Sequence, residues 1–220
     1  MKLCSNELLD IWRKRMINFI YFDVGGVLLR DFSGNDGYED LKKAIGVDIQ
    51  NEKAFDIFFD EITPEICTTL DVNDLLPKLK KEFGASTNED FSLLKAFVDR
   101  FEKLDFMQDT CDKITSRYNS GLLTNMYPRM LDEIKQQGKL PNTEWKTIID
   151  SSTVGFAKPD EKIFHLAEKE CGRKPKEILF IDNTRGHLEV AKSLDWQTFW
   201  FDPKNPEESA NILLKKLGLE

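Results

Sequence analysis

Five short apolar runs, spread unevenly along the chain, constrain its fold most strongly. They lie at residues 17–22, 121–124, 147–150, 178–182 and 196–201. The first run is apolar on both faces, which is typical of a buried central strand in a parallel sheet. Helical patterns separate or follow the later runs, at about 127–137, 160–171, 185–194 and 206–217. This alternation of strand and helix predicts an α/β fold with a doubly wound, mostly parallel, Rossmann-like sheet.

The segment from residue 33 to residue 105 breaks this alternation and contains no convincing strand. Its apolar residues instead recur at helical spacing, in the sets Phe55, Phe58, Phe59, Ile62 and Val72, Leu75, Leu76, Leu79, Phe83. Pro77 is tolerated only in the first turn of a helix, so this second helix is expected to begin near Asp74. The pattern predicts an inserted all-α helical-bundle cap.

The proposed organisation follows from these boundaries. Residues 16–32 and 106–220 form the α/β core, residues 33–105 form the helical cap, and residues 1–15 form an N-terminal appendage with a short charged helix. A length of 220 residues fits one core with one sizeable insertion.

Charge and cysteine content narrow the function classes. The 31 basic and 39 acidic residues give a net charge of −8, which argues against nucleic-acid or membrane-surface partners. No apolar stretch approaches the roughly 20 residues of a membrane span, and charges interrupt any signal-peptide core near the N-terminus. The four cysteines are scattered and form no CxxC pair, as in reduced cytosolic proteins. We therefore expect a cytoplasmic protein, and the sequence leaves its oligomeric state open.

Polar residues follow four of the apolar runs or their connecting helices. They are Asp23 with Gly25 and Gly26, then Thr124 with Asn125, then Lys158, then Asp182 with Asn183. Ligands of a doubly wound sheet bind beyond the carboxyl ends of its strands, so these residues are expected to converge on one crevice. Each has an ordinary alternative, as a turn-capping Asp, a helix N-cap or a solvated lysine. Their order at successive strand ends favours a site.

The residue types suit phosphate chemistry. Asp23 beside paired glycines can act as a nucleophile, and exposed backbone N–H groups there can bind an anion. Thr124 and Asn125 can donate hydrogen bonds to phosphate oxygens. Hard oxygen ligands such as Asp182 suit Mg²⁺.

Taken together, the stretches at 22–28, 122–125, 155–164 and 178–183 resemble the haloacid dehalogenase (HAD)-like hydrolase superfamily, over about residues 16–204. The resemblance implies a Mg²⁺-dependent phosphatase acting on a small phosphorylated metabolite through an aspartyl-phosphate intermediate. It implies catalytic roles for Asp23 and Lys158. The implied phosphate-binding residues are Gly25, Gly26, Thr124, Asn125 and Lys158, and the implied metal ligands are Asp23, Gly25, Asp182 and Asn183.

Two positions depart from the pattern of the superfamily. Its phosphatases usually carry a second Asp, the general acid and base, where this chain has Gly25. Such a group is worth about 10²–10⁴-fold in rate, so alkyl leaving groups are expected to react slowly. Asn183 stands where a metal-binding Asp is usual, and its amide brings no charge to the metal. The neighbouring Asp182 would have to supply that charge. We therefore expect weakened affinity for Mg²⁺.

Two alternatives stay open at this point. The chain could be a phosphate-ligand-binding or regulatory HAD-fold protein with weak or no turnover, as Gly25 and Asn183 would suit. Haloacid dehalogenase activity is less favoured, because the aromatic residue at position 25 and the serine-rich fourth motif of those enzymes are missing. His187 is interpreted as a surface or capping histidine. Asp31, Phe32 and Asn35 lie near the cap hinge, where specificity would arise.

Overall fold

Five parallel strands form the central sheet, in the order β5-β4-β1-β6-β7. The computed structural model describes residues 17–33, 35–47 and 50–220, so the appendage predicted at 1–15 lies outside the described residues. The strands are β1 (Phe19–Phe22), β4 (Asn119–Thr124), β5 (Thr147–Asp150), β6 (Ile178–Asp182) and β7 (Gln197–Trp200). All five predicted runs form strands, and the doubly wound parallel sheet is confirmed.

The register of the sheet aligns the ends of its central strands. Phe22, the last residue of β1, pairs with Leu122 on one side and Ile181 on the other. The ladder continues one step further, because the Asp23 N–H donates to the Ile181 carbonyl at 2.9 Å. The residues that follow β1, β4 and β6 therefore start from one edge of the sheet.

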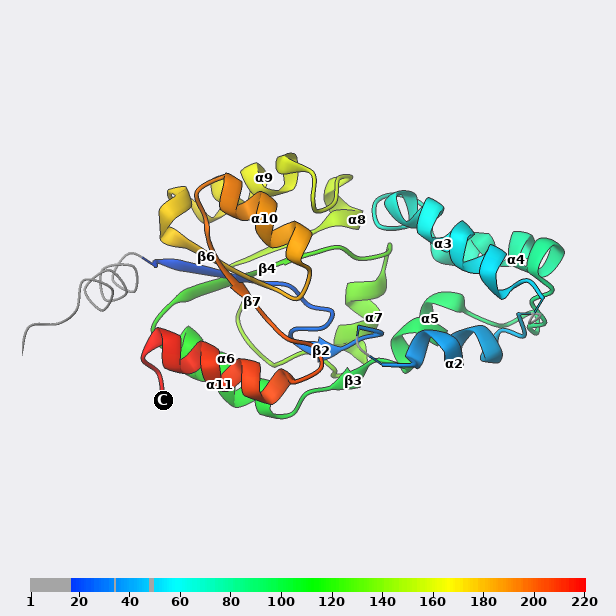
Figure 1. Cartoon of the computed structure of the whole chain (residues 1–220), viewed down its shortest axis with the longest axis horizontal. Helices are drawn as coiled ribbons and strands as arrows, with labels where there is room; N and C mark the ends of the chain where they lie inside the picture. The colour runs from blue at the N-terminus through cyan, green and yellow to red at the C-terminus, as the bar shows by residue number, and fades with distance from the viewer. Residues whose placement is uncertain (1–16, 34, 48–49) are drawn as a thin grey trace, which may run out of the picture.

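Helices cover both faces of this sheet (Figure 1). Phe19 and Tyr21 belong to one buried cluster, with residues of α9 and α10. Ile20 and Phe22 point the other way and belong to a second cluster, with residues of α6, α7 and α11. The helices are α6 (Phe106–Thr115), α7 (Met130–Gln136), α9 (Glu161–Cys171), α10 (Arg185–Ser193) and α11 (Pro206–Leu217). The alternating directions of β1 side chains explain why this strand is apolar on both faces.

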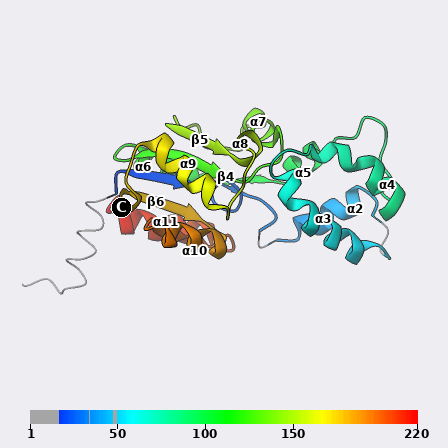
Figure 2. The ribbon, with the colours of Figure 1, turned by 90° about the horizontal axis from the view of Figure 1, so that it is seen from above.

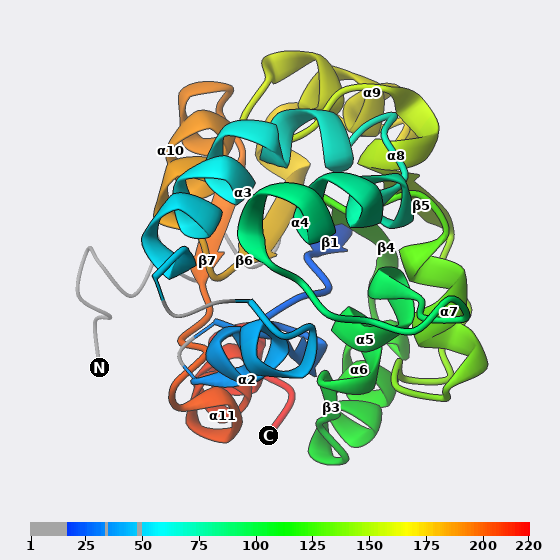
Figure 3. The same cartoon turned by 90° about the vertical axis from the view of Figure 1, so that its right-hand side faces the viewer.

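Four further helices lie together beyond the carboxyl ends of the strands (Figures 2 and 3). They are α2 (Gly37–Ala44), α3 (Glu52–Ile66), α4 (Leu76–Phe83) and α5 (Leu93–Asp99), with a 3₁₀ turn at Val72–Leu75. Pro77 falls in the first turn of α4, as predicted. Short elements complete the chain, at α8 (Ser151–Val154) and a 3₁₀ turn at Pro175–Glu177. None of the described helices is long and apolar enough to cross a membrane.

The expectation that residues 33–105 contain no strand is wrong at one place. Strand β3 (Glu102–Lys103) pairs antiparallel with β2 (Leu29–Arg30). Arg30 also forms an ion pair with Glu102, at 3.2 Å between Nε and Oε2. A two-residue strand is too short to show alternating hydrophobicity, so the sequence gives no sign of it. The ribbon holds the outgoing and returning ends of the helical segment side by side.

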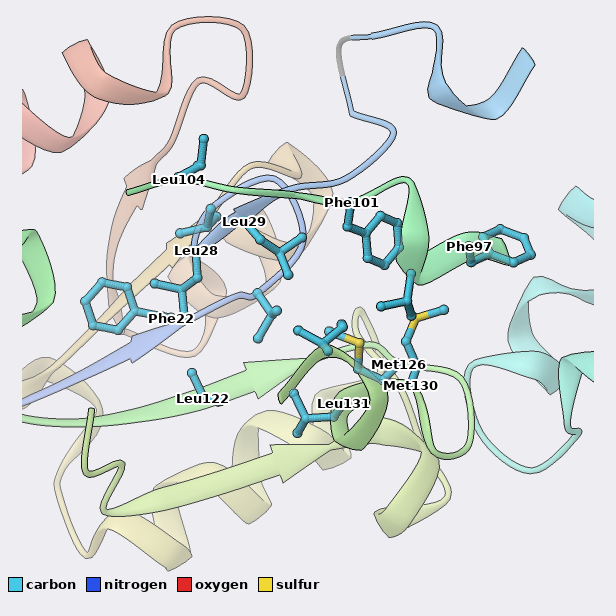
Figure 4. Packing of buried hydrophobic residues seen from close by; sticks show 14 of the residues in the cluster. Phe22, Leu28, Leu29, Phe97, Phe101, Leu104, Leu122, Met126, Met130 and Leu131 are labelled. Carbon is cyan, nitrogen blue, oxygen red and sulfur yellow. The ribbon is translucent and has the colours of Figure 1, made fainter. Parts of the chain in front are cut away.

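A single hydrophobic cluster connects the sheet with the helical segment (Figure 4). It extends from Phe22 of β1 and Leu122 of β4, on one face of the sheet, to Phe97 of α5 and Met130 of α7. Phe97 also meets Tyr127 edge to face, with ring centroids 5.3 Å apart. The helical segment is therefore packed onto the core beside the carboxyl edge of the sheet.

Candidate active site

A cavity of about 430 Å³ opens where the helical segment meets the carboxyl edge of the sheet. The segments after the strands of the sheet contribute Asp23, Gly25, Asn125, Asn183 and Thr184, and the segment after β2 contributes Asp31, Phe32 and Ser33. Cys67 and Phe97 of the helical segment also line the cavity. This volume lies within the usual range of small-molecule sites. Its polar residues gather near the strand ends, where Asp31 approaches Gly25 and Ser33 bonds to Asn183, and mostly apolar side chains line the rest.

Lys158 lies behind this cavity, and its side chain is fully buried. Its Nζ atom has three partners: Asp182 Oδ2 at 2.7 Å, Asp23 Oδ1 at 3.0 Å and the Leu123 carbonyl at 3.0 Å. Burial alone would lower the pKa of Lys158, but the two carboxylates hold it above its usual value. The lysine therefore stays charged and links the ends of β1, β4 and β6.

Asp23 sits directly after β1 with little exposure to solvent. Its Oδ1 accepts the Val24 N–H at 2.8 Å and faces Lys158. Burial raises the pKa of Asp23 to about 6, against the opposing effect of Lys158. Both contacts fall on Oδ1, so Oδ2 is the oxygen left to face a ligand.

Asp182, at the end of β6, is completely buried and heavily hydrogen-bonded. Its Oδ1 accepts the Thr184 N–H at 2.6 Å, and its Oδ2 meets Lys158 and, at 3.0 Å, His187 Nδ1. Burial would raise the pKa of Asp182, yet Lys158 and His187 lower it to about 2. His187, interpreted from the sequence as a surface or capping histidine, instead approaches this carboxylate from α10.

Asn125 holds the backbone of Lys158 through two hydrogen bonds. Its amide nitrogen donates to the Lys158 carbonyl at 2.8 Å, and its amide oxygen accepts the Lys158 N–H at 2.8 Å. The sequence predicted that Asn125 binds phosphate. The structure shows its side chain fixing the segment that carries the lysine.

Thr124 is the last residue of β4, and its side chain has no solvent exposure. Its hydroxyl oxygen is one of four buried polar side-chain atoms, within the described part of the chain, that lack a hydrogen-bond partner. A buried hydroxyl without a partner costs about 1–3 kcal/mol, so the position suits a ligand that supplies one.

Gly25 and Gly26 allow a close approach that no other residue would permit. A Cβ at Gly25 would lie 2.5 Å from Asp31 Oδ2. A Cβ at Gly26 would collide with the Asn183 amide, and Gly26 also has a φ of +72°. The two glycines therefore let the turn after β1 approach both Asp31 and Asn183.

The groups around the cavity fit a hard cation with a low ligand charge. Asp23, Asp182 and His187 offer atoms within 4.8 Å of one another. Asp182, however, directs Oδ2 at Lys158 and His187, and the cavity wall carries Asn183 in its place. Oxygen donors on Asp23, Gly25 and Asn183 can hold Mg²⁺, with Asp23 as the one charged ligand.

Comparison with known proteins decides the family. The family model of the haloacid dehalogenase-like hydrolases matches residues 17–195, which include every residue of the site. The chain belongs to the haloacid dehalogenase-like hydrolases. The resemblance read from the sequence is confirmed, and the protein is a hydrolase of this family.

Two relatives of known name are similar to the chain in sequence. D-ribitol-5-phosphate phosphatase of Bacteroides thetaiotaomicron is 24% identical over 212 residues, covering 86% of this chain and 93% of that protein. Mouse acyl-CoA dehydrogenase family member 10 is 32% identical over 79 residues, which are 36% of this chain and 7% of the mouse protein. The chain therefore matches only a small part of that relative.

A solved HAD family enzyme of Bacteroides thetaiotaomicron, in complex with magnesium and inorganic phosphate, shares the fold with a TM-score of 0.66 at 20% identity. That match covers 84% of this chain and 93% of the solved one.

Proposed function

We propose that this HAD-like hydrolase is a Mg²⁺-dependent phosphatase that hydrolyses a small phosphorylated metabolite through an aspartyl-phosphate. The observation that carries the proposal is the Lys158–Asp23 pair, 3.0 Å apart at the sheet side of a cavity of small-molecule size. A relative that covers most of the chain is a phosphatase, and a protein of the same fold binds magnesium and phosphate.

Each residue of the site has one role in this reaction. Asp23 Oδ2 attacks phosphorus, while Lys158 keeps Oδ1 oriented and reduces the negative charge around the phosphoryl group. The unpartnered Thr124 hydroxyl donates to a phosphoryl oxygen. Asn125 positions Lys158, and Gly25 and Gly26 bring backbone N–H groups close to the anion. Phosphoryl transfer requires mainly such positioning and charge compensation.

Mg²⁺, held by Asp23, the Gly25 carbonyl and one of the neighbouring residues Asp182 and Asn183, would supply positive charge next to the phosphoryl oxygens. Asn183 faces the cavity and Asp182 lies behind it against Lys158. We therefore assign Asn183 as the direct ligand and Asp182 as the group that holds Lys158 in place. This arrangement suits weak binding of the cation.

A phosphate-release screen tests the proposed function. Sugar phosphates, nucleotides and phospho-acids are each incubated with the protein, with and without Mg²⁺. Release that requires Mg²⁺, disappears in Asp23→Asn and persists in Asp90→Asn supports the proposal. Asp90 is a matched control because it is exposed, in the loop before α5. Undiminished turnover by Asp23→Asn would contradict the proposal.

A second candidate function is binding of a phosphorylated ligand without turnover. Two observations favour it: all three donors of Lys158 are used within the protein, and Gly25 offers no acid. Calorimetric binding of several phosphorylated compounds, with no phosphate released from any of them, would establish this function instead of the first.

A further inference from the structure

The cavity that contains Asp23 holds a second carboxylic acid. Of the described residues that line it, four carry a side chain that can release a proton: Asp23, Asp31, Cys67 and Tyr127. Burial raises the pKa of Cys67 to about 11 and the pKa of Tyr127 above its usual range, so both hold their protons tightly. Asp23 is the nucleophile of the proposed reaction. Asp31 is therefore the remaining acid that can exchange a proton with a ligand in this cavity.

The Asp31 carboxyl group fills the space into which a side chain at position 25 would point. A Cβ at Gly25 would lie 2.5 Å from Asp31 Oδ2 and 3.3 Å from Asp31 Cγ. Standard bond lengths place a carboxyl oxygen about 2.4 Å from its own Cβ. The distance from a Cβ at position 25 to Asp31 Oδ2 thus equals the distance from the Cβ of an aspartate to its own carboxyl oxygen.

Neighbouring residues fix Asp31 in this position. The Ser33 N–H donates to Asp31 Oδ1 at 2.8 Å, and the Ser33 hydroxyl accepts from the Asn183 amide at 3.1 Å. The preceding strand β2 is attached to the turn after β1, because the Gly26 N–H donates to the Leu29 carbonyl at 2.9 Å. Oδ1 is thereby held by the chain beyond β2, while Oδ2 faces Gly25.

We propose that Asp31 is the general acid and base of this hydrolase, in the place where Gly25 has no side chain. The inference rests on the proposed phosphatase function and adds a residue to it. The carboxyl group thus belongs to the segment after β2 and not to residue 25.

The proton follows a closed cycle in this reaction. As Asp23 bonds to phosphorus, the bond from phosphorus to the ester oxygen breaks. The ester oxygen keeps the electron pair, takes the proton of Asp31 and leaves as an alcohol. The Asp31 carboxylate then removes a proton from a water whose oxygen bonds to phosphorus. The bond to Asp23 breaks, its electron pair returns to the Asp23 carboxylate, and inorganic phosphate leaves.

The dependence of the rate on the leaving group tests this role. Asp31→Asn keeps the size of the side chain but cannot supply the proton. We expect kcat/KM for the best alkyl phosphate, with ribitol 5-phosphate as the first probe, to fall by about 10²–10⁴-fold, because this constant reports the step that releases the alcohol and not the later attack of water. With p-nitrophenyl phosphate, whose leaving group needs little protonation, the loss should stay below about tenfold. Asp36→Asn, at an exposed aspartate on the same connection, should change neither rate.

Each other outcome identifies the claim that fails. An equal loss with both esters, or no loss with the alkyl ester, would overturn the role of Asp31 and leave the phosphatase function intact. A wild-type protein that cleaves p-nitrophenyl phosphate but no alkyl ester would also overturn it. A wild-type protein that cleaves neither would overturn both proposals.

Exchanging the two positions gives a second, independent test. Gly25→Asp alone should lose activity with both esters, because its side chain collides with Asp31. Asp31→Ala alone should lose kcat/KM mainly with the alkyl ester. The double variant restores one carboxyl group to the same space, and we expect it to exceed Asp31→Ala by at least about tenfold with that ester. A folded double variant no better than Asp31→Ala would contradict the proposal.

Discussion

Lys158 and Asp182 form a fully buried ion pair, with 2.7 Å between Nζ and Oδ2, and Asp23 lies slightly farther from the same lysine at 3.0 Å. One cation therefore serves two carboxylates. Asp182 receives the stronger interaction and has a lowered pKa, whereas burial raises the pKa of Asp23. The pair explains how the fold keeps a lysine charged behind the cavity, whereas burial makes Asp23, the proposed nucleophile, an unfavourable anion in the metal-free protein.

Replacing Asp23 by Asn should stabilise the metal-free protein near neutral pH. An unfolded Asp titrates near pH 4, and folded Asp23 titrates at about pH 6. The folded state thus binds this proton more tightly, so the contribution is full below about pH 4 and lost as the pH rises through about 6. Asn does not titrate and avoids the loss.

We expect Asp23→Asn to gain about 3 kcal/mol in the free energy of unfolding at pH 7 relative to wild type, and little at about pH 4. Urea unfolding with EDTA at both pH values measures the difference. A variant that is no more stable than wild type at pH 7 would show that Asp23 is not an unfavourable anion.

Removing the lysine should be strongly destabilising. Lys158→Met leaves Asp23 and Asp182 buried without their cation, and breaking such a pair costs about 3–5 kcal/mol. Adding Asp182→Asn removes one of the two stranded carboxylates, so the double variant should recover part of this loss. Urea unfolding of wild type, both single variants and the double variant gives the coupling energy. Strictly additive effects would contradict a shared buried pair.

Thr124 should matter for phosphate binding but not for folding. Its hydroxyl has no partner in the protein, so Thr124→Val should leave the free energy of unfolding unchanged or raise it by about 1 kcal/mol. A hydrogen bond to a charged group contributes about 1.5–3 kcal/mol, so kcat/KM should fall by about 10–100-fold. Thr124→Ser keeps the hydroxyl and should retain most activity. Full activity in Thr124→Val would exclude the assigned contact.

Asn183→Asp should strengthen the binding of Mg²⁺. The side chain lines the cavity, and a carboxylate there adds a second charged ligand beside Asp23. Ser33, which now accepts from the Asn183 amide, can donate its hydroxyl to the new carboxylate. We expect the Mg²⁺ concentration for half-maximal activity to fall about tenfold or more. Asn142→Asp, at an exposed loop residue before β5, is the control, and an equal change in both variants would indicate a nonspecific charge effect.

The strands could be predicted because a strand that is buried on both faces appears in the sequence as a short, continuous apolar run. Runs such as 147–150 and 178–182 appear in the structure with the same bounds. The meeting of Asp23 and Asp182 also follows from the sequence, since parallel strands place their carboxyl ends at one edge, and Lys158 reaches both from the loop before α9.

Other features depend on contacts that no local pattern records. The role of Asn125 requires the Lys158 backbone to come within hydrogen-bond distance, across 33 residues of chain. The place of Asp31 depends on the close approach of its segment to Gly25, which only the folded turn after β1 creates. The β2–β3 ribbon is too short for any periodicity. Tertiary proximity, rather than propensity, decides all three.

The most direct test of the central claim is the detection of a phosphoryl group on Asp23. The protein is mixed with Mg²⁺ and its best phosphate ester, quenched in acid during turnover, and mapped by peptide mass spectrometry. We predict an increase of one phosphoryl mass on the peptide that contains Asp23, and its absence in Asp23→Asn. Rapid phosphate release with no such adduct, continuing undiminished in Asp23→Asn, would contradict nucleophilic catalysis by this residue.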